Sequence, residues 1–409
     1  MSRLSIRLSP NSLLKKGGRG SCRAANQRFS RDSGSAGASP CRRMVAFQRA
    51  ANVRVIAVLL VFLFMAHARA IAGPAAGQEE EGPLVAALIA EASRKAAAAE
   101  KAEQTALAGS GGWLYFVPEL RAIGVGRFWG ADAARVSRSS KPEYADPLEV
   151  IVDFHAQLEK AGIELLVVPV PAKLAVYPEP ILDGLRKPGG SQVPRLDVNH
   201  REFYAVLRER GVAVLDLLPV FLEKRTSPDG ELYCKTDSHW SGRGVVVAAE
   251  VMAARVDGRP WLKELPKERY VTEDRRVTIA GDLAKMIDEA DPASETLSHT
   301  LVGRKKGDRV VPDATARNSP VLLMGDSHTL VFHDPTLFAS GAGLPDHLAR
   351  HLGFPVDLIG VRGSGATTTR IELLRRKDNL QGKKLVIWCF SFREFTESTT
   401  GWRKVPVVR

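Results

Sequence analysis

The stretch VLLMGDSHTLVF (Val321–Phe332) begins as an apolar run and changes to a polar turn at Asp326. A continuous apolar run of this length is typical of a strand that is covered on both faces of a parallel sheet. Ser327 follows the predicted strand at the turn into a predicted helix, where we expect freed amide groups and the helix dipole to favour developing negative charge. The stretch therefore predicts a buried strand with a nucleophilic serine at its end, although Ser327 could also be only a helix cap.

Similar apolar runs alternate with helical patterns outward from this stretch. The alternation predicts an α/β fold, a three-layer sandwich with a mainly parallel sheet, in which ligands gather at the carboxyl ends of the strands. The predicted strands are IELLVVPV (163–170), VAVLDLL (212–218), PVLLMG (320–325), FPVDLIGV (354–361) and KLVIWCF (384–390), and the predicted helices lie at 147–161, 203–210 and 371–376. Residues 262–318 show no clear periodicity, and we interpret them as an insertion or a lid.

The segment YCKTDSHW (233–240) places Asp237 and His239 close together, just ahead of a small-residue run that predicts a helix. A serine hydroxyl is a weak nucleophile until a histidine takes its proton, and that histidine needs a carboxylate to fix its tautomer. His239 and Asp237 could fill these two roles for Ser327. The alternative for Asp237 is a cap of the following helix.

Four further residues are weaker candidates for contacts with the reacting groups. Gly363 and Gly365, in the segment RGSGA, could bring backbone amides to an oxyanion or could simply form a tight turn. Lys173 and Tyr177 lie in a predicted strand-to-loop turn, where such residues are more often structural than in contact with substrate.

The spacing of His328, His333 and Asp334 could suggest a metal site. The nine histidines of the chain, however, show no HExxH or facial-triad run. Cys234 and Cys389 fit no zinc pattern and could either form a disulfide or remain buried thiols. We therefore predict no metal and no other cofactor.

The net charge of +12 would by itself suggest nucleic acid or an acidic surface as a partner. The whole excess of basic residues lies within residues 1–70, and the chain from residue 71 onward has no net charge. Nucleic acid is therefore not a predicted partner.

Residues 44–72 have the composition of a secretory signal peptide, with basic residues, an apolar run at 55–66, and small residues at Ala68 and Ala70. We expect cleavage near Ala70, or an N-terminal anchor if the segment is kept. Residues 1–43 lack apolar periodicity and are predicted to be a disordered or untranslated leader. The remaining chain is predicted to comprise a linker with an Ala-rich helix (73–108), a main domain (109–397) and a tail (398–409).

Five sequence blocks give the chain a resemblance to a known family. The blocks GWLYFVPEL, VVPVPAKLAVYPE, KTDSHW, LLMGDSH and VIWCFSFRE occur in the order seen in the alginate O-acetyltransferase family, which has an SGNH hydrolase-like domain. The resemblance implies that Ser327 is the nucleophile, His239 the general base and Asp237 its orienting partner, in a permuted order in which Asp and His precede the serine. Arg393 is retained from the family pattern, whereas Cys389 replaces the glutamate that commonly follows the last strand's tryptophan.

The resemblance implies an exported O-acetyltransferase, in the periplasm or on the outer face of the cytoplasmic membrane. It would acetylate hydroxyls of an extracellular, alginate-like polysaccharide through an acetyl-serine intermediate, and a membrane-bound O-acyltransferase would supply the acetyl groups. One alternative is a carbohydrate O-acetylesterase of the SGNH type, which would use water as acceptor. A second alternative is a non-catalytic cell-surface assembly protein that kept the fold.

Overall fold

The computed structural model describes residues 78–185 and 193–408, and a five-stranded sheet lies at their centre. The strand order is β4-β3-β10-β8-β9, and every neighbouring pair is parallel. The strands are β3 (Glu164–Val170), β4 (Ala213–Val214), β8 (Val321–Gly325), β9 (Asp357–Gly360) and β10 (Leu385–Ser391). All seven residues of β10 are buried, which explains its continuous apolar sequence. The predicted leader and signal segment lie outside the described residues.

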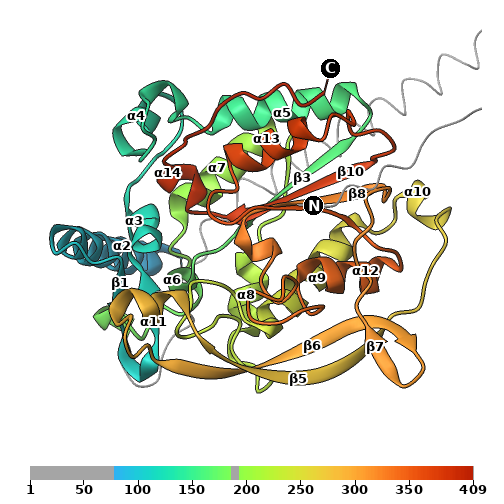
Figure 1. The fold of residues 1–409 in the computed structure, drawn as a ribbon. Coiled ribbons are helices and arrows are strands. Elements are labelled where there is room, and N and C mark those ends of the chain that lie inside the picture. The colour runs from blue at the N-terminus through green and yellow to red at the C-terminus, as the bar shows by residue number, and fades with distance from the viewer. Residues whose placement is uncertain (1–77, 186–192, 409) are drawn as a thin grey trace, which may run out of the picture. The chain divides into compact units, whose positions relative to one another are not determined.

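Helices cover both faces of this sheet, as Figure 1 shows. One face carries α5 (Leu148–Lys160), α7 (Val198–Glu209) and α13 (Thr367–Arg375), and the other carries α8 (Leu218–Lys224), α9 (Gly242–Val256) and α12 (Leu344–Leu352). The predicted three-layer α/β architecture is confirmed. The predicted strand at 212–218 is too long, because α8 begins at Leu218 and has a proline in its first turn.

Residues 262–318, interpreted from the sequence as an insertion or a lid, contain a regular antiparallel sheet that is separate from the central sheet. Its strands are β5 (Val271–Ala280), β6 (Ser294–Lys306) and β7 (Arg309–Val311), and α11 (Asp282–Ile287) connects β5 to β6. Most side chains of β5 are exposed, and Ile279 is its one buried residue. The hydrophobic pattern is weak for this reason, since a strand that packs little apolar surface has no strong alternation to detect.

The N-terminal part of the described chain packs a long Ala-rich helix, α2 (Gln78–Lys101), against α3 (Val117–Gly124). Small side chains let the two helices approach closely, and a Cβ at Gly124 would collide with Ser93. A short hairpin, β1 (Ala106–Ala108) and β2 (Leu114–Phe116), follows α2. Within the described part of the chain, no helix is long and apolar enough to span a membrane.

The predicted tail, residues 398–409, is packed into the domain as far as Val407. Trp402 is 1% exposed and stacks on Phe395. The guanidinium of Arg370 lies 5.2 Å from the ring centroid of Trp388 and 5.9 Å from that of Trp402, and it donates a hydrogen bond to the carbonyl of Arg403. These contacts make the last residues part of the core.

Candidate active site

The turn that follows β8 presents Ser327 at the carboxyl end of the sheet. A Cβ at Gly325 would collide with the carbonyl oxygen of Cys389 on β10, so only glycine lets β8 approach β10 at this point. The chain then makes a single 3-10 turn, η5 (Ser327–Thr329), which Asp326 caps by accepting a hydrogen bond from the backbone N–H of His328 at 2.9 Å. The predicted helix after Ser327 is therefore wrong, and so is the cap role for this serine.

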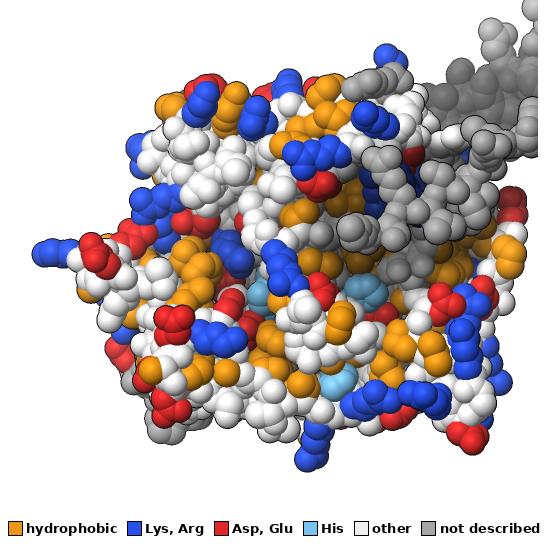
Figure 2. Space-filling view, in the orientation of Figure 1, with side chains coloured by type: hydrophobic (Ala, Val, Ile, Leu, Met, Phe, Trp, Pro, Cys, Tyr) orange, Lys and Arg blue, Asp and Glu red, His pale blue; other side chains and the backbone are white. Residues whose placement is uncertain are grey.

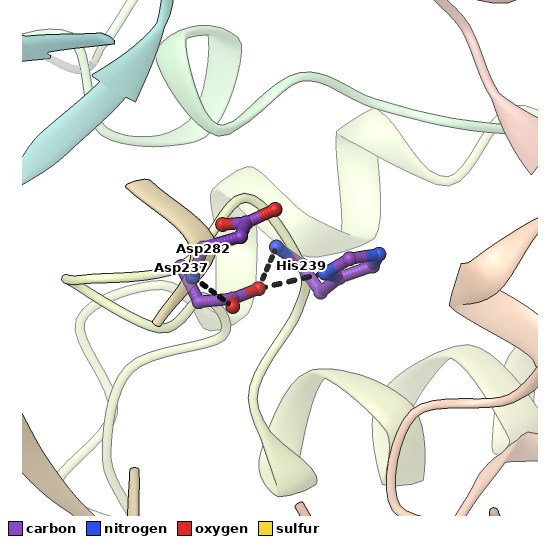
Figure 3. A group of neighbouring side chains, drawn as sticks. All are labelled: Asp237, His239 and Asp282. Atoms are coloured by element: carbon purple, nitrogen blue, oxygen red, sulfur yellow. Dashed lines mark hydrogen bonds and ion pairs between the residues drawn. The ribbon is translucent and has the colours of Figure 1, made fainter. Parts of the chain in front are cut away.

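Asp237, His239 and Ser327 form a continuous hydrogen-bonded chain. Nδ1 of His239 lies 2.7 Å from Oδ1 of Asp237, and Nε2 lies 2.6 Å from Oγ of Ser327, which is 88 residues away in sequence. The Asp237 carboxylate also accepts the backbone N–H of His239 at 3.0 Å (Figure 3). The structure thus brings together the three residues for which the sequence predicts a triad.

The segment that carries Asp237 and His239 is a loop just ahead of α9. Ser241 caps α9 by accepting the backbone N–H of Gly244 at 3.2 Å, which excludes the alternative role of Asp237 as the cap. An isolated bridge between Tyr233 and Trp240 closes the base of the loop. Asp237 is therefore free to orient His239.

The helix α11 holds the loop that carries Asp237 and His239 from the side of the antiparallel sheet. The backbone N–H of Asp282 donates to Oδ2 of Asp237 at 2.7 Å. In return, the carboxylate of Asp282 accepts from the backbone N–H and the hydroxyl of Ser238 at 2.7 and 2.6 Å. Figure 3 shows Asp282 beside Asp237 and His239. This reciprocal contact fixes the Asp237 carboxylate on the edge that His239 does not occupy.

Two further groups anchor the same loop. The carboxylate of Glu295, on β6, accepts the backbone N–H groups of Lys235 and Thr236 and the hydroxyl of Thr236 at 2.7 to 3.0 Å. The buried ammonium of Lys173 donates to the carbonyls of Lys235 and Leu114 at 3.2 and 2.8 Å. Asp282 and Glu295 are not predicted from the sequence, because isolated carboxylates in a segment without periodicity carry no recognisable motif.

The charges of the triad are set by burial and by the contact between Asp237 and His239. Burial raises the pKa of Asp237, but the imidazole of His239 and the hydrogen bonds to the carboxylate outweigh this effect and hold the pKa below its usual value. Burial lowers the pKa of His239, and the Asp237 carboxylate more than reverses this, so the pKa is raised. The pair therefore combines an ionised carboxylate with a histidine that readily takes a proton.

The remaining predicted residues differ in what they contact. A Cβ at Gly365 would lie 2.9 Å from the backbone nitrogen of Asp326, so this glycine packs directly against the turn at Ser327. Gly363 is exposed and has a φ of 91°, a conformation that favours glycine. Tyr177 donates its hydroxyl hydrogen to the carbonyl of Arg225 and accepts the backbone N–H of Leu232, contacts that stabilise the fold.

Arg393 follows β10 and lies near the triad. Its Nη1 donates to Glu119 at 3.1 Å and to the hydroxyl of Ser391 at 2.8 Å. Burial raises the pKa of Asp326. The neighbouring His328 and, more weakly, the charge of Arg393 outweigh this effect and hold the pKa below its usual value. Histidine side chains are visible in a hollowed central part of the face in Figure 2, among hydrophobic, acidic and basic side chains.

The residues with a metal-like spacing do not meet at one point, because each has its own partner. His328 pairs with Asp326 at 3.0 Å, His333 with Asp346 at 2.8 Å, and Asp334 with Arg362 at 2.9 Å. A different group, comprising Asp237, His239 and Asp282, has possible ligand atoms within 4.8 Å of one another. Its ring nitrogen and carboxylates are engaged in the hydrogen bonds of the triad and of Ser238.

The family model of the SGNH hydrolase-like domain of the acetyltransferase AlgX matches residues 106–392. The chain belongs to this family. The match starts close to the expected domain start at residue 109 and covers the segments that carry Asp237, His239 and Ser327. It confirms the resemblance on which the predicted SGNH hydrolase-like fold rests.

Individual family members are similar over different shares of their length. The probable alginate O-acetylase AlgJ of Pseudomonas syringae pv. tomato is 30% identical over 162 residues, which is 39% of this chain and 35% of the relative. AlgJ of Pseudomonas aeruginosa is 26% identical over 306 residues, 70% of this chain and 69% of the relative. The chain thus spans about a third of the first relative and somewhat over two thirds of the second.

Two solved structures share the fold. The O-acetyltransferase domain of Pseudomonas putida AlgJ has a TM-score of 0.50 at 20% identity, covering 71% of this chain and 92% of that domain. AlgX of Pseudomonas aeruginosa has a TM-score of 0.52 at 18% identity, covering 70% of this chain and 62% of that protein. At these identities the similarity establishes the architecture of the family domain.

Proposed function

We propose that this chain is an O-acetyltransferase that acetylates hydroxyls of an alginate-like polysaccharide through an acetyl-serine at Ser327. The observation that carries the proposal is the hydrogen-bonded chain from Asp237 through His239 to Ser327. Family membership supports the acyl-transfer chemistry, and the names of the relatives, which include alginate O-acetylase, support the polysaccharide acceptor.

In the first half-reaction, Oγ of Ser327 attacks the carbonyl carbon of an acetyl donor while its proton passes to Nε2 of His239. The ionised carboxylate of Asp237 stabilises the imidazolium that forms. Backbone N–H groups at the Ser327 turn and at the adjacent Gly365 are the proposed donors to the oxyanion. When the tetrahedral intermediate collapses, the donor oxygen leaves with the proton from His239, and the acetyl group remains on Ser327.

In the second half-reaction, a sugar hydroxyl replaces the departed donor. His239 takes the hydroxyl proton, and the sugar oxygen attacks the acetyl carbonyl carbon. Collapse of this second intermediate breaks the bond to Oγ of Ser327, which recovers the proton from His239. The sugar leaves as an acetyl ester, and the enzyme returns to its starting state.

The acetyl donor and the location of the chain complete the proposal. Residues 44–72 would direct export, so the domain would act in the periplasm or on the outer face of the cytoplasmic membrane. Acetyl-CoA does not cross membranes, and a membrane-bound O-acyltransferase would therefore present acetyl groups to the exported domain.

The proposal can be tested with p-nitrophenyl acetate as an artificial donor. We expect mass spectrometry to find one acetyl group on the peptide that contains Ser327, and Ser327→Ala to abolish it. Ser238→Ala is the matched control for the position of the acetyl group, because Ser238 also lies between an Asp and a His but donates to Asp282; it should still leave the acetyl group on the Ser327 peptide, at a lower rate. An acetyl group that persists in Ser327→Ala would overturn the proposal. Acetyl release to water alone, in the presence of alginate oligosaccharides and other saccharides, would favour the esterase.

A further inference from the structure

The loop that follows Ser327 contains two phenylalanines in a backbone conformation that bulky residues rarely adopt. Phe332 has a φ of 62° and Phe338 a φ of 78°, in the left-handed region. Such residues persist only where the surrounding structure holds them, and they cluster at functional sites. The two phenylalanines are therefore candidates for a functional role.

Backbone and side-chain hydrogen bonds both hold this loop in its conformation. The backbone N–H of Phe332 donates to the carbonyl of Leu337 at 2.9 Å, and the carbonyl of Phe332 accepts from Ala342 at 2.8 Å. On the outer side, the Asp334 carboxylate accepts the backbone N–H and the hydroxyl of Thr336 at 2.9 and 2.7 Å, and also binds Arg362. The position of Phe338 is thus fixed by the loop.

The rings of Phe332 and Phe338 form a row of edge-on contacts that leads from the core to His239. Phe332 is completely buried, and its ring centroid lies 5.3 Å from that of Phe338 in an edge-on arrangement. Phe338 is only partly buried, and its centroid lies 6.5 Å from that of His239, again edge-on. A fixed, accessible aromatic surface therefore stands beside the histidine that must receive the proton of the acceptor.

We propose that Phe338 is the apolar wall of the acceptor subsite and sets the preference for a sugar hydroxyl over water. This inference rests on the proposed function. A sugar whose hydroxyl reaches Nε2 of His239 at hydrogen-bond distance must place its ring within a few ångström of that histidine, at about the depth of Phe338. The C–H face of the sugar packs on the aromatic ring, whereas water gains nothing from it, and the bound sugar excludes water from the acetyl-serine.

The test separates the two half-reactions in the full-length protein. Release of p-nitrophenolate from p-nitrophenyl acetate measures acetylation of Ser327, and the ratio of acetylated saccharide to free acetate measures the choice of acceptor. We expect Phe338→Ala to change acetylation by less than about threefold and to lower this ratio about tenfold, the scale of one lost apolar contact in a specificity pocket. Phe338→Trp, which keeps an aromatic surface, should restore most of the ratio.

Leu337→Ala is the matched control, since Leu337 lies in the same loop and is also partly buried but has no ring beside His239. It should leave the ratio unchanged, and thermal unfolding should show that both variants are folded. An unchanged ratio in Phe338→Ala, or an equal fall in Leu337→Ala, would overturn the inference and leave the proposed function intact. A wild-type protein that transfers acetyl to no acidic or neutral oligosaccharide would also overturn it. Loss of the proposed function is recognised separately, by acetylation that survives Ser327→Ala.

Discussion

Two copies of the sequence Asp-Ser-His, at 237–239 and 326–328, adopt the same local turn and meet different surroundings. In each turn the histidine donates its backbone N–H to the aspartate carboxylate, at 3.0 Å in the first and 2.9 Å in the second. In each, Nδ1 of the histidine also lies near the same carboxylate oxygen, at 2.7 and 3.0 Å. The three residues therefore determine the conformation of the turn but not the role of its histidine and serine.

The difference arises from what lies beyond each turn. In the first turn, Nε2 of His239 lies beside the hydroxyl of Ser327 in the second turn, while the serine of the first turn, Ser238, donates to Asp282. In the second turn the serine is presented to His239, while His328 is 1% exposed. Burial lowers the pKa of His328 and Asp326 only partly offsets this effect, so that the pKa is about 4. The pKa of His239 is raised, because the effect of Asp237 outweighs that of burial. The same pair thus gives a histidine that readily takes a proton in one place and a buried, neutral histidine in the other.

The largest expected contrast is between the two histidines. His239→Ala should slow acetylation of Ser327 by about a thousandfold or more, because the hydroxyl loses its base. His328→Ala should slow it by less than about tenfold per folded molecule, and should instead lower the free energy of unfolding by about 3 kcal/mol through a cavity and a lost buried contact. Burst kinetics and chemical unfolding measure the two effects. Equal losses of rate would mean that both turns take part in the chemistry.

A smaller effect is expected from Asp282, which contacts only the first turn. Burial lowers the pKa of His239, the Asp237 carboxylate raises it more strongly, and the negative charge of Asp282 adds a smaller increase. The proposed mechanism requires a neutral His239, so activity should fall as the pH drops through this pKa. Asp282→Asn should therefore move the acid limb of the acetylation rate to lower pH and reduce the plateau about tenfold, because the Asp237 carboxylate is held less firmly.

Asp291→Asn is the control for this experiment, because Asp291 is exposed and follows the same helix. It should leave the pH profile unchanged. A purely structural role for Asp282 would reduce the rate equally at every pH, and an unshifted acid limb would contradict the prediction.

The smallest expected effect concerns stability in acid. His328 has a folded-state pKa of about 4, below its ordinary value of 6.5, so the unfolded chain binds more protons between these values. Stability should then fall as the pH drops from 6.5 to 4, with a slope of at most about 1.4 kcal/mol per pH unit for this group. His239, whose pKa is raised, contributes in the opposite sense. His328→Asn should flatten the fall relative to wild type in urea unfolding at several pH values, and an unchanged slope would contradict it.

The sequence predicted the central sheet because its strands are buried on both faces and therefore read as unbroken apolar runs. It also predicted the association of Asp237, His239 and Ser327, since these residues lie in distinctive blocks. It could not predict the support from Asp282 and Glu295, because much of it runs through backbone N–H groups, which leave no trace in a side-chain pattern. The predicted helix after Ser327 is wrong for a different reason, because the left-handed residue Phe332 redirects the chain soon after the 3-10 turn.

The hairpin of β5 and β6 has a consequence for how such an enzyme can diverge. Two carboxylates at the end of the hairpin that α11 connects, Asp282 and Glu295, hold the backbone of the loop that carries Asp237, while most side chains of β5 face solvent. Substitutions at the exposed positions of β5 should therefore cost little stability, yet small shifts at the α11 end of the hairpin are passed to the orientation of His239. We expect lineages of this family to tune their rate by drift in the hairpin, while the residues that touch the acetyl group stay the same.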